Sequence, residues 1–128
     1  MISYGFTKEL NSSFEDVCEA LPDKLQEEGF GVLTKIPIHE KLKEKIGVDF
    51  KKYMIFGACH PPSAHKSLTA EENIGLMLPC NVIVYDKEGK TVLAVIRPTV
   101  AMQMIDNSEL LPVAREVEEK LKRVFDSF

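Results

Sequence analysis

The chain has 128 residues, of which 45% are hydrophobic and 28% are charged, and its formal net charge is −4. This length and composition are typical of one globular domain, residues 1–128, with a single core, and they exclude a disordered or fibrous chain. The 16 basic residues are interspersed among 20 acidic ones. Nucleic acid is therefore not expected as a partner, because binding it requires a concentrated positive field.

The first residues do not show the pattern of a signal peptide, which is a basic segment followed by an apolar run. No stretch of the sequence approaches the roughly 18 consecutive apolar residues that a membrane-spanning helix needs. We therefore expect a cytoplasmic protein with no membrane partner. The three cysteines are too few and too irregularly spaced for a disulfide framework, and a reducing cytosol would keep them as thiols.

Residues 2–7 predict a first strand that ends where polar residues begin at Lys8. A helix follows, because Ser13 with Asp16 resembles a capping box. Pro22 is expected to kink or split this helix, and Gly29 to end it. Its core-facing stripe has helical spacing and consists of Phe14, Val17, Cys18, Leu21 and Leu25.

Residues 30–38 predict a second strand, with Val32, Thr34 and Ile36 on one face. A short helix is expected from His39 to about Ile46. Residues 53–59 predict a third strand, whose almost continuous apolar run is typical of a position inside a sheet.

Residues 61–78 have a helical pattern, in which Thr69 followed by Glu72 resembles another capping box. Residues 80–86 and 91–96 predict a hairpin, with Gly89 supplying the positive φ of its turn. Residues 108–125 predict the last helix from their apolar stripe.

This order of elements indicates an α+β fold with a mostly antiparallel sheet of about five strands and helices on one face. Such a sheet leaves its second side open, and pairing with another copy would cover it. A homodimer is therefore expected.

The strongest candidate site lies at one end of the sheet. If residues 53–59 and 80–86 are antiparallel neighbours, Cys59 and Cys80 meet there, and the connection between them also carries His60 and His65. Asn81 lies on the face opposite Cys80, where it can bind a loop or a ligand. Thiols and imidazoles are the ligands that soft metals prefer, although close C-x2-C pairs are missing. Simple core packing is the main alternative, because cysteine is among the most buried residue types.

The motifs of nucleotide-binding, serine-hydrolase, zincin, thioredoxin-type and c-haem proteins are absent from the sequence. Two segments instead resemble a known family: G-A-C-x-P-P-x-A-H at Gly57–His65 and L-P-C-N at Leu78–Asn81. They are similar to the domain of unknown function 302, and the resemblance spans nearly the whole chain. It implies a TATA-binding-protein-like β-α-β4-α fold and dimers, and the fusion of some relatives to sulfur-transfer domains favours thiol or sulfur chemistry. The positions implied are Cys59, Pro61, Pro62, His65, Cys80 and Asn81, whereas His60 stands where relatives commonly have Asn.

Three functional hypotheses follow. The first is a homodimeric protein that binds a small ligand or a sulfur-carrier protein through Cys59, His65, Cys80 and Asn81. The second is an enzyme or sulfur carrier that uses Cys59 as a thiolate, with His65 or a helix terminus lowering its pKa and Cys80 as a resolving thiol. The third is a metal protein with Cys59, His65 and Cys80 as ligands. No cofactor is indicated.

Overall fold

A computed structural model describes residues 2–128. Its five strands are β1 (Gly5–Leu10), β2 (Gly31–Pro37), β3 (Tyr53–Cys59), β4 (Cys80–Lys87) and β5 (Lys90–Ile96). They form one sheet in the order β1-β5-β4-β3-β2, and every neighbouring pair is antiparallel. The predicted α+β class and the order strand, helix, four strands, helix are confirmed.

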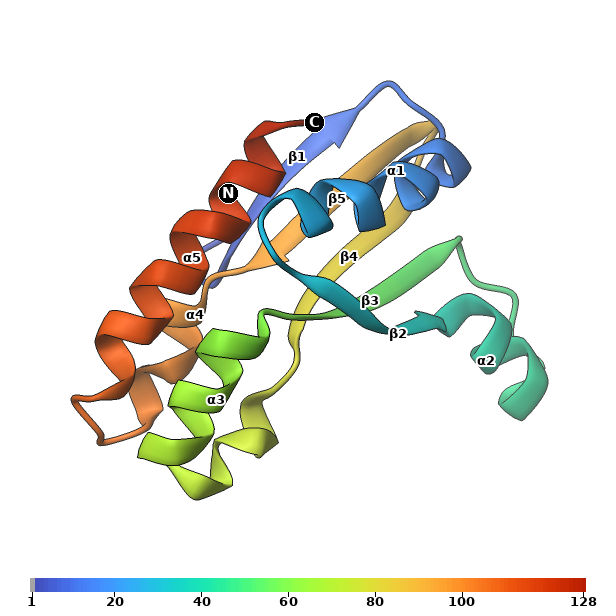
Figure 1. Ribbon diagram of the computed structural model, residues 1–128. Coiled ribbons are helices and arrows are strands. Elements are labelled where there is room, and N and C mark those ends of the chain that lie inside the picture. The colour runs from blue at the N-terminus through green and yellow to red at the C-terminus, as the bar shows by residue number, and fades with distance from the viewer. Residues whose placement is uncertain (1) are drawn as a thin grey trace.

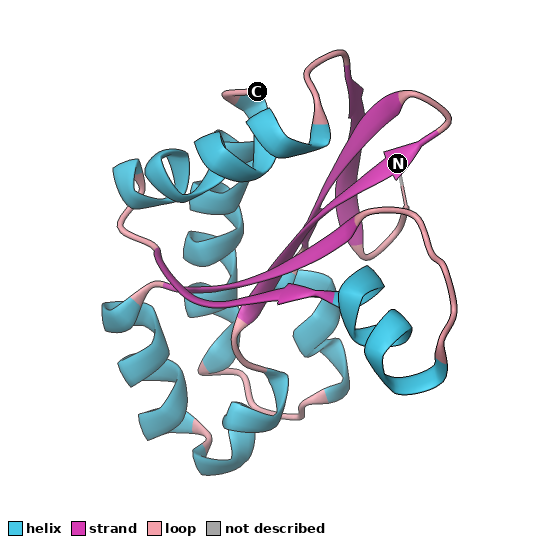
Figure 2. Ribbon diagram, turned by 90° about the vertical axis from the view of Figure 1, so that its right-hand side faces the viewer, coloured by secondary structure: helices cyan, strands magenta, loops and turns pink. Residues whose placement is uncertain are grey.

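The helices are α1 (Phe14–Glu27), α2 (Ile38–Ile46), α3 (Pro61–Ala70), α4 (Pro98–Ala101) and α5 (Leu110–Asp126), with 3-10 turns η1 (Glu72–Met77) and η2 (Met102–Met104). Most of them gather on one side of the sheet, while α2 lies beyond the end of β2 (Figures 1 and 2). None of the helices described is long and apolar enough to cross a membrane.

The core lies between the sheet and the two long helices α1 and α5. Each helix supplies a stripe with 3.6-residue spacing, and alternate residues of the inner strands supply the opposing surface. Fully buried examples are Leu21 and Leu25 from α1, Leu121 from α5, and Phe56, Val82 and Leu93 from the sheet.

The predicted helix boundaries of α1 are confirmed at both ends. The Ser13 hydroxyl accepts a hydrogen bond from the Asp16 N–H at 3.1 Å. Gly29 has a φ of +84°, and the N–H groups of Gly29 and Phe30 donate to the carbonyls of Gln26 and Leu25, which is the Schellman arrangement. Pro22 does not split the helix, which runs through it.

Two strand predictions are wrong. β1 continues past Lys8 and Glu9 to Leu10, because an edge strand accommodates charged side chains. In β2 a bulge between Val32 and Thr34 reverses the alternation. Val32 therefore packs on the core, whereas Thr34 and Ile36 lie on the opposite face.

The third correction concerns Thr69, which does not cap a second helix. Its hydroxyl donates back to the His65 carbonyl at 2.8 Å, and α3 ends one residue later at Ala70. The β4–β5 hairpin is confirmed. Its two turn residues, Glu88 and Gly89, have φ values of +50° and +85°.

Candidate functional site

A cavity of about 350 Å³, here called the main cavity, lies where β3 and β4 end against α3 and α5. β3 and β4 are antiparallel neighbours, and Ala58 of β3 is paired with Cys80 of β4. This pairing brings Cys59 and Cys80 to the same end of the sheet, and both residues line the main cavity. All three cysteines of the chain are free thiols.

The wall formed by α3 carries most of the polar groups. His60 stands at the N-cap of α3, and His60, Ser63, Ala64 and Ser67 lie on the helix face that lines the cavity. His60 Nδ1 lies 2.7 Å from Ser63 Oγ, and its ring centroid lies 5.5 Å from that of Phe30. Ser63 and Ser67 are both buried.

The opposite wall is apolar. It comes from the inward face of α5 and from the segment that precedes this helix, and its residues are Pro98, Met102, Leu110, Val113, Ala114 and Val117. Among residues 2–128, no Asp, Glu, Lys or Arg side chain lines the main cavity. The cavity therefore has one polar wall, one apolar wall and no fixed charge.

Burial controls the ionisation of the groups in the wall. Burial raises the pKa of the Cys80 thiol to about 11, and the neighbouring Cys59 adds to the shift. Burial also lowers the pKa of the His60 imidazole, with Lys120 and Lys66 acting in the same direction and Glu116 opposing them. At neutral pH the Cys80 thiol and the His60 ring are therefore uncharged.

Two predicted site residues lie outside the main cavity. His65 does not line it, because it stands on the side of α3 that faces away from His60, Ser63 and Ser67. Asn81 is exposed on the other face of the sheet and lines a separate, smaller cavity. His60, the histidine that the family pattern disfavoured, is the one that lines the main cavity with the thiols.

The predicted metal set does not assemble. Within the part of the chain that the structure describes, no group of three or more His, Cys, Asp or Glu side chains is placed to hold a metal ion. The reason is the same: His65 points away from the side of α3 where Cys59 and Cys80 lie.

Sequence reasoning missed the serines of α3 and the whole α5 wall. The spacing of His60, Ser63 and Ser67 at i, i+3 and i+7 is a usable signal, because it places three polar side chains on one helix face. No comparable signal marked the α5 residues. They belong to an ordinary apolar stripe, and only the tertiary structure shows that its first turns border a cavity.

The family model described as "Domain of unknown function DUF302" matches residues 6–128. The chain belongs to the DUF302 family. A crystal structure of an uncharacterized conserved protein DUF302 from Bacillus stearothermophilus is similar to it, with a TM-score of 0.90, 31% sequence identity and 98% of both chains covered. Comparison with curated proteins yields no match. The DUF302 assignment agrees with the resemblance seen in the sequence and carries no activity with it.

Proposed function

We propose that this DUF302 protein binds a small, uncharged, mainly apolar molecule in its main cavity and that it acts as a cytoplasmic homodimer. The observation that carries the proposal is the cavity itself. A volume of about 350 Å³ with a mostly apolar lining and a few polar groups is typical of small-molecule sites. A cavity of roughly 150 Å³ is large enough for benzene, so this one accommodates a considerably larger molecule.

The lining supports an uncharged ligand. A charged group would have to leave water for a cavity with no opposing charge, which is strongly unfavourable. The neutral Cys80 thiol, the Ser63 and Ser67 hydroxyls and the neutral His60 ring instead offer hydrogen bonds to a ligand. A ligand with one polar edge and one apolar side satisfies both walls.

Binding is tested with an uncharged dye whose fluorescence rises in apolar surroundings. Ala64 lines the main cavity from α3, so Ala64→Phe places an aromatic ring in it. We expect the dye to bind the unmodified protein and to lose affinity by about tenfold or more in this variant, since the added ring occupies the ligand's space.

The matched control is His65→Phe, which places the same ring on the same helix but on the side that does not line the cavity. It should leave the affinity unchanged. Equal dye binding by Ala64→Phe and the unmodified protein would contradict the assignment of the main cavity. A loss of dye affinity in His65→Phe alone would favour the binding residues predicted from the sequence, which include His65.

The homodimer is proposed from the sheet face that the helices leave open, here called the open face. One row across the five strands consists of Thr7, Ala94, Ile83, Ile55 and Ile36, none of which is charged. Beside this row the rings of Tyr53 and Tyr85 stack with centroids 5.2 Å apart. A sheet with solvent on one side usually alternates apolar with polar residues. A second copy can cover this face without burying a charge from the row.

Thiol chemistry is the second candidate function, and the presence of Cys59 and Cys80 in one cavity wall favours it. In this version the thiolate of Cys59, which is half-buried, attacks the disulfide of a bound molecule and expels one of its sulfurs as a thiolate. Cys80 then attacks the Cys59 sulfur, which releases the second thiolate and leaves a Cys59–Cys80 disulfide. The pH midpoint at which an alkylating agent labels Cys59 in the folded protein separates this function from binding alone.

A further inference from the structure

A second cavity of about 140 Å³, here called the side cavity, adjoins the main one at the end of the sheet. Four residues line both cavities: Pro79, Cys80, Pro98 and Met102. The two spaces therefore share a wall formed by these four residues. The remaining lining of the side cavity is Met77, Asn81, Ile96 and Ala101.

The side cavity lies at the start of β4, where consecutive residues point to opposite faces of the sheet. Cys80 pairs with Ala58 and packs against the core under the helices. Asn81, the next residue, pairs with Gly57 and so points to the open face. Gly57 is needed there, because a Cβ atom at this position would clash with Thr34 Oγ1 and would lie 2.7 Å from Pro79 Cγ. A path from the main to the side cavity therefore passes around the end of β4.

We propose that the main and side cavities form one elongated site for an unbranched, uncharged molecule, with its apolar chain in the main cavity and its polar end beside Asn81. This inference rests on the proposed function and defines the ligand class. Met102 stands in the shared wall, and its unbranched side chain with three rotatable bonds adjusts to a chain passing between the cavities.

The chemistry of the side cavity selects the polar end. Within the described chain, no Asp, Glu, Lys, Arg or His side chain lines it. The Asn81 amide is its strongest hydrogen-bonding side chain, and it both donates and accepts. Such a group matches a hydroxyl, carbonyl or amide end and offers nothing to a carboxylate or phosphate that must give up its hydration.

The test uses n-alkanols of about six to about eighteen carbons as competitors of the uncharged dye. Each added methylene that enters an apolar site strengthens binding by about fourfold. A main cavity of about 350 Å³ holds roughly a dozen carbons, judged by the benzene-sized cavity of ~150 Å³. In the unmodified protein we expect the fourfold gain to continue beyond that length, because the chain extends into the side cavity.

Ala101 lines the side cavity and not the main one, so Ala101→Phe fills the former alone. In this variant the gain in affinity per added methylene should stop at a chain about four carbons shorter than in the unmodified protein. Short alkanols should bind as tightly as before. A second variant, Asn81→Leu, replaces an exposed side chain and so leaves the core intact. It should weaken long alkanols by about fivefold and leave short ones unchanged, which keeps the test valid if Ala101→Phe fails to fold.

The elongated site would be overturned if affinity stopped rising at the same alkanol length in the unmodified protein and in Ala101→Phe, and if Asn81→Leu had no effect. This result would leave the proposed function standing. A dye that is displaced by no alkanol of any length, or that binds equally well to Ala64→Phe, would instead overturn the proposed function. The two failures are thus separate results.

Discussion

Gly29 lies at the end of α1 and next to His60, which lines the main cavity. It has a φ of +84°, and a Cβ atom there would lie 3.0 Å from Cδ2 of His60. Gly47, which ends α2, has a similar φ of +68°, but a Cβ atom at this position would meet no other atom within 4 Å. The two glycines therefore share a backbone requirement and differ in their side-chain surroundings.

We predict that Gly47→Ala lowers the free energy of unfolding by about 1 kcal/mol, the usual cost of a left-handed residue with a Cβ atom. Gly29→Ala should cost about 1 kcal/mol more and weaken dye binding, because the methyl group displaces the His60 ring. Urea unfolding and dye titration measure both effects. Equal costs for the two variants would show that His60 is not held by Gly29.

The thiols provide a pH-dependent prediction at the same scale. Burial raises the pKa of Cys18 and of Cys80 to about 11 from an ordinary 9.0, with Glu15 adding to the shift at Cys18. A raised thiol pKa means less thiolate, so at about pH 8 both should react with iodoacetamide about a hundredfold more slowly than in the unfolded chain. Their rates should climb between about pH 9 and 11. Peptide mapping by mass spectrometry follows each cysteine separately.

The same experiment decides the second candidate function. A thiol enzyme requires Cys59 to be alkylated in the folded protein with a midpoint well below that of an ordinary thiol. A midpoint at the ordinary value, or no labelling of Cys59, leaves binding as the function of the main cavity.

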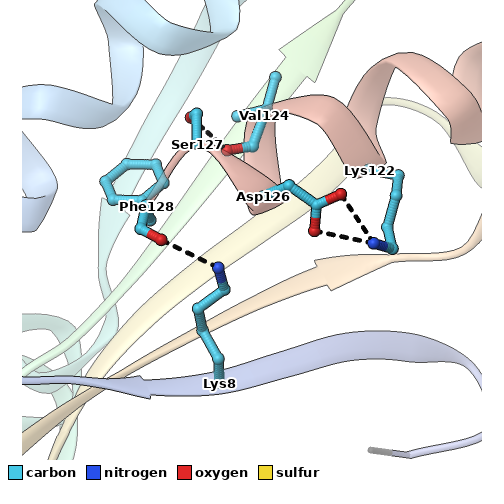
Figure 3. A network of polar contacts seen from close by, with 6 residues as sticks. All are labelled: Lys8, Lys122, Val124, Asp126, Ser127 and Phe128. Atoms are coloured by element: carbon cyan, nitrogen blue, oxygen red, sulfur yellow. Dashed lines mark hydrogen bonds and ion pairs between the residues drawn. The ribbon is translucent and has the colours of Figure 1, made fainter.

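At the scale of elements, the edge strand β1 is fastened to the end of α5 (Figure 3). The Lys8 ammonium donates to the Phe128 carbonyl at 3.1 Å and lies 4.3 Å from the centroid of the Phe125 ring. At the last turn of α5, Lys122 pairs with Asp126 at 2.7 Å. A positive group at a helix C-terminus is favourable because the last carbonyls carry partial negative charge.

We predict that Lys8→Met lowers the free energy of unfolding by about 1 kcal/mol, since it keeps the apolar stem and removes the charge. Lys90→Met is the control, because the Lys90 ammonium donates to the exposed Asn11 side chain. It should cost less than about 0.5 kcal/mol. Urea unfolding of both variants tests the difference. Equal losses in the free energy of unfolding would contradict a stabilising role of Lys8 between β1 and the end of α5.

Some of the helices and strands could be predicted from the sequence and others could not. Periodicity and capping residues predicted β3, α1, α2 and the β4–β5 hairpin, because these signals act within a few residues. The bulge in β2 and the extension of β1 were missed, since both depend on the neighbouring strand. The site was predicted in part: strand pairing located Cys59 and Cys80, whereas the choice of His60 over His65 depends on which side of α3 meets α5.

At the scale of the whole molecule, the open face supports the prediction of a dimer. Ile83 lies at the middle of the uncharged row, on the central strand β4. Ile83→Glu should yield a monomer, because each copy would bury a carboxylate without a partner in the proposed interface. Sedimentation velocity measures the change.

Leu76→Glu is the control, since Leu76 is 88% exposed on η1, which packs against helix α3. It should leave the dimer intact. A monomeric unmodified protein, or a dimer broken by Leu76→Glu and not by Ile83→Glu, would contradict the assignment of the open face.

The bulge in β2 has a consequence for how copies of this protein meet. β2 is an edge strand, and its bulge interrupts the regular ladder that an incoming strand would have to extend. The other border, β1, is short and carries Lys8 and Glu9. Both borders thus discourage open-ended fibre growth, as the proposed closed pair of two copies requires.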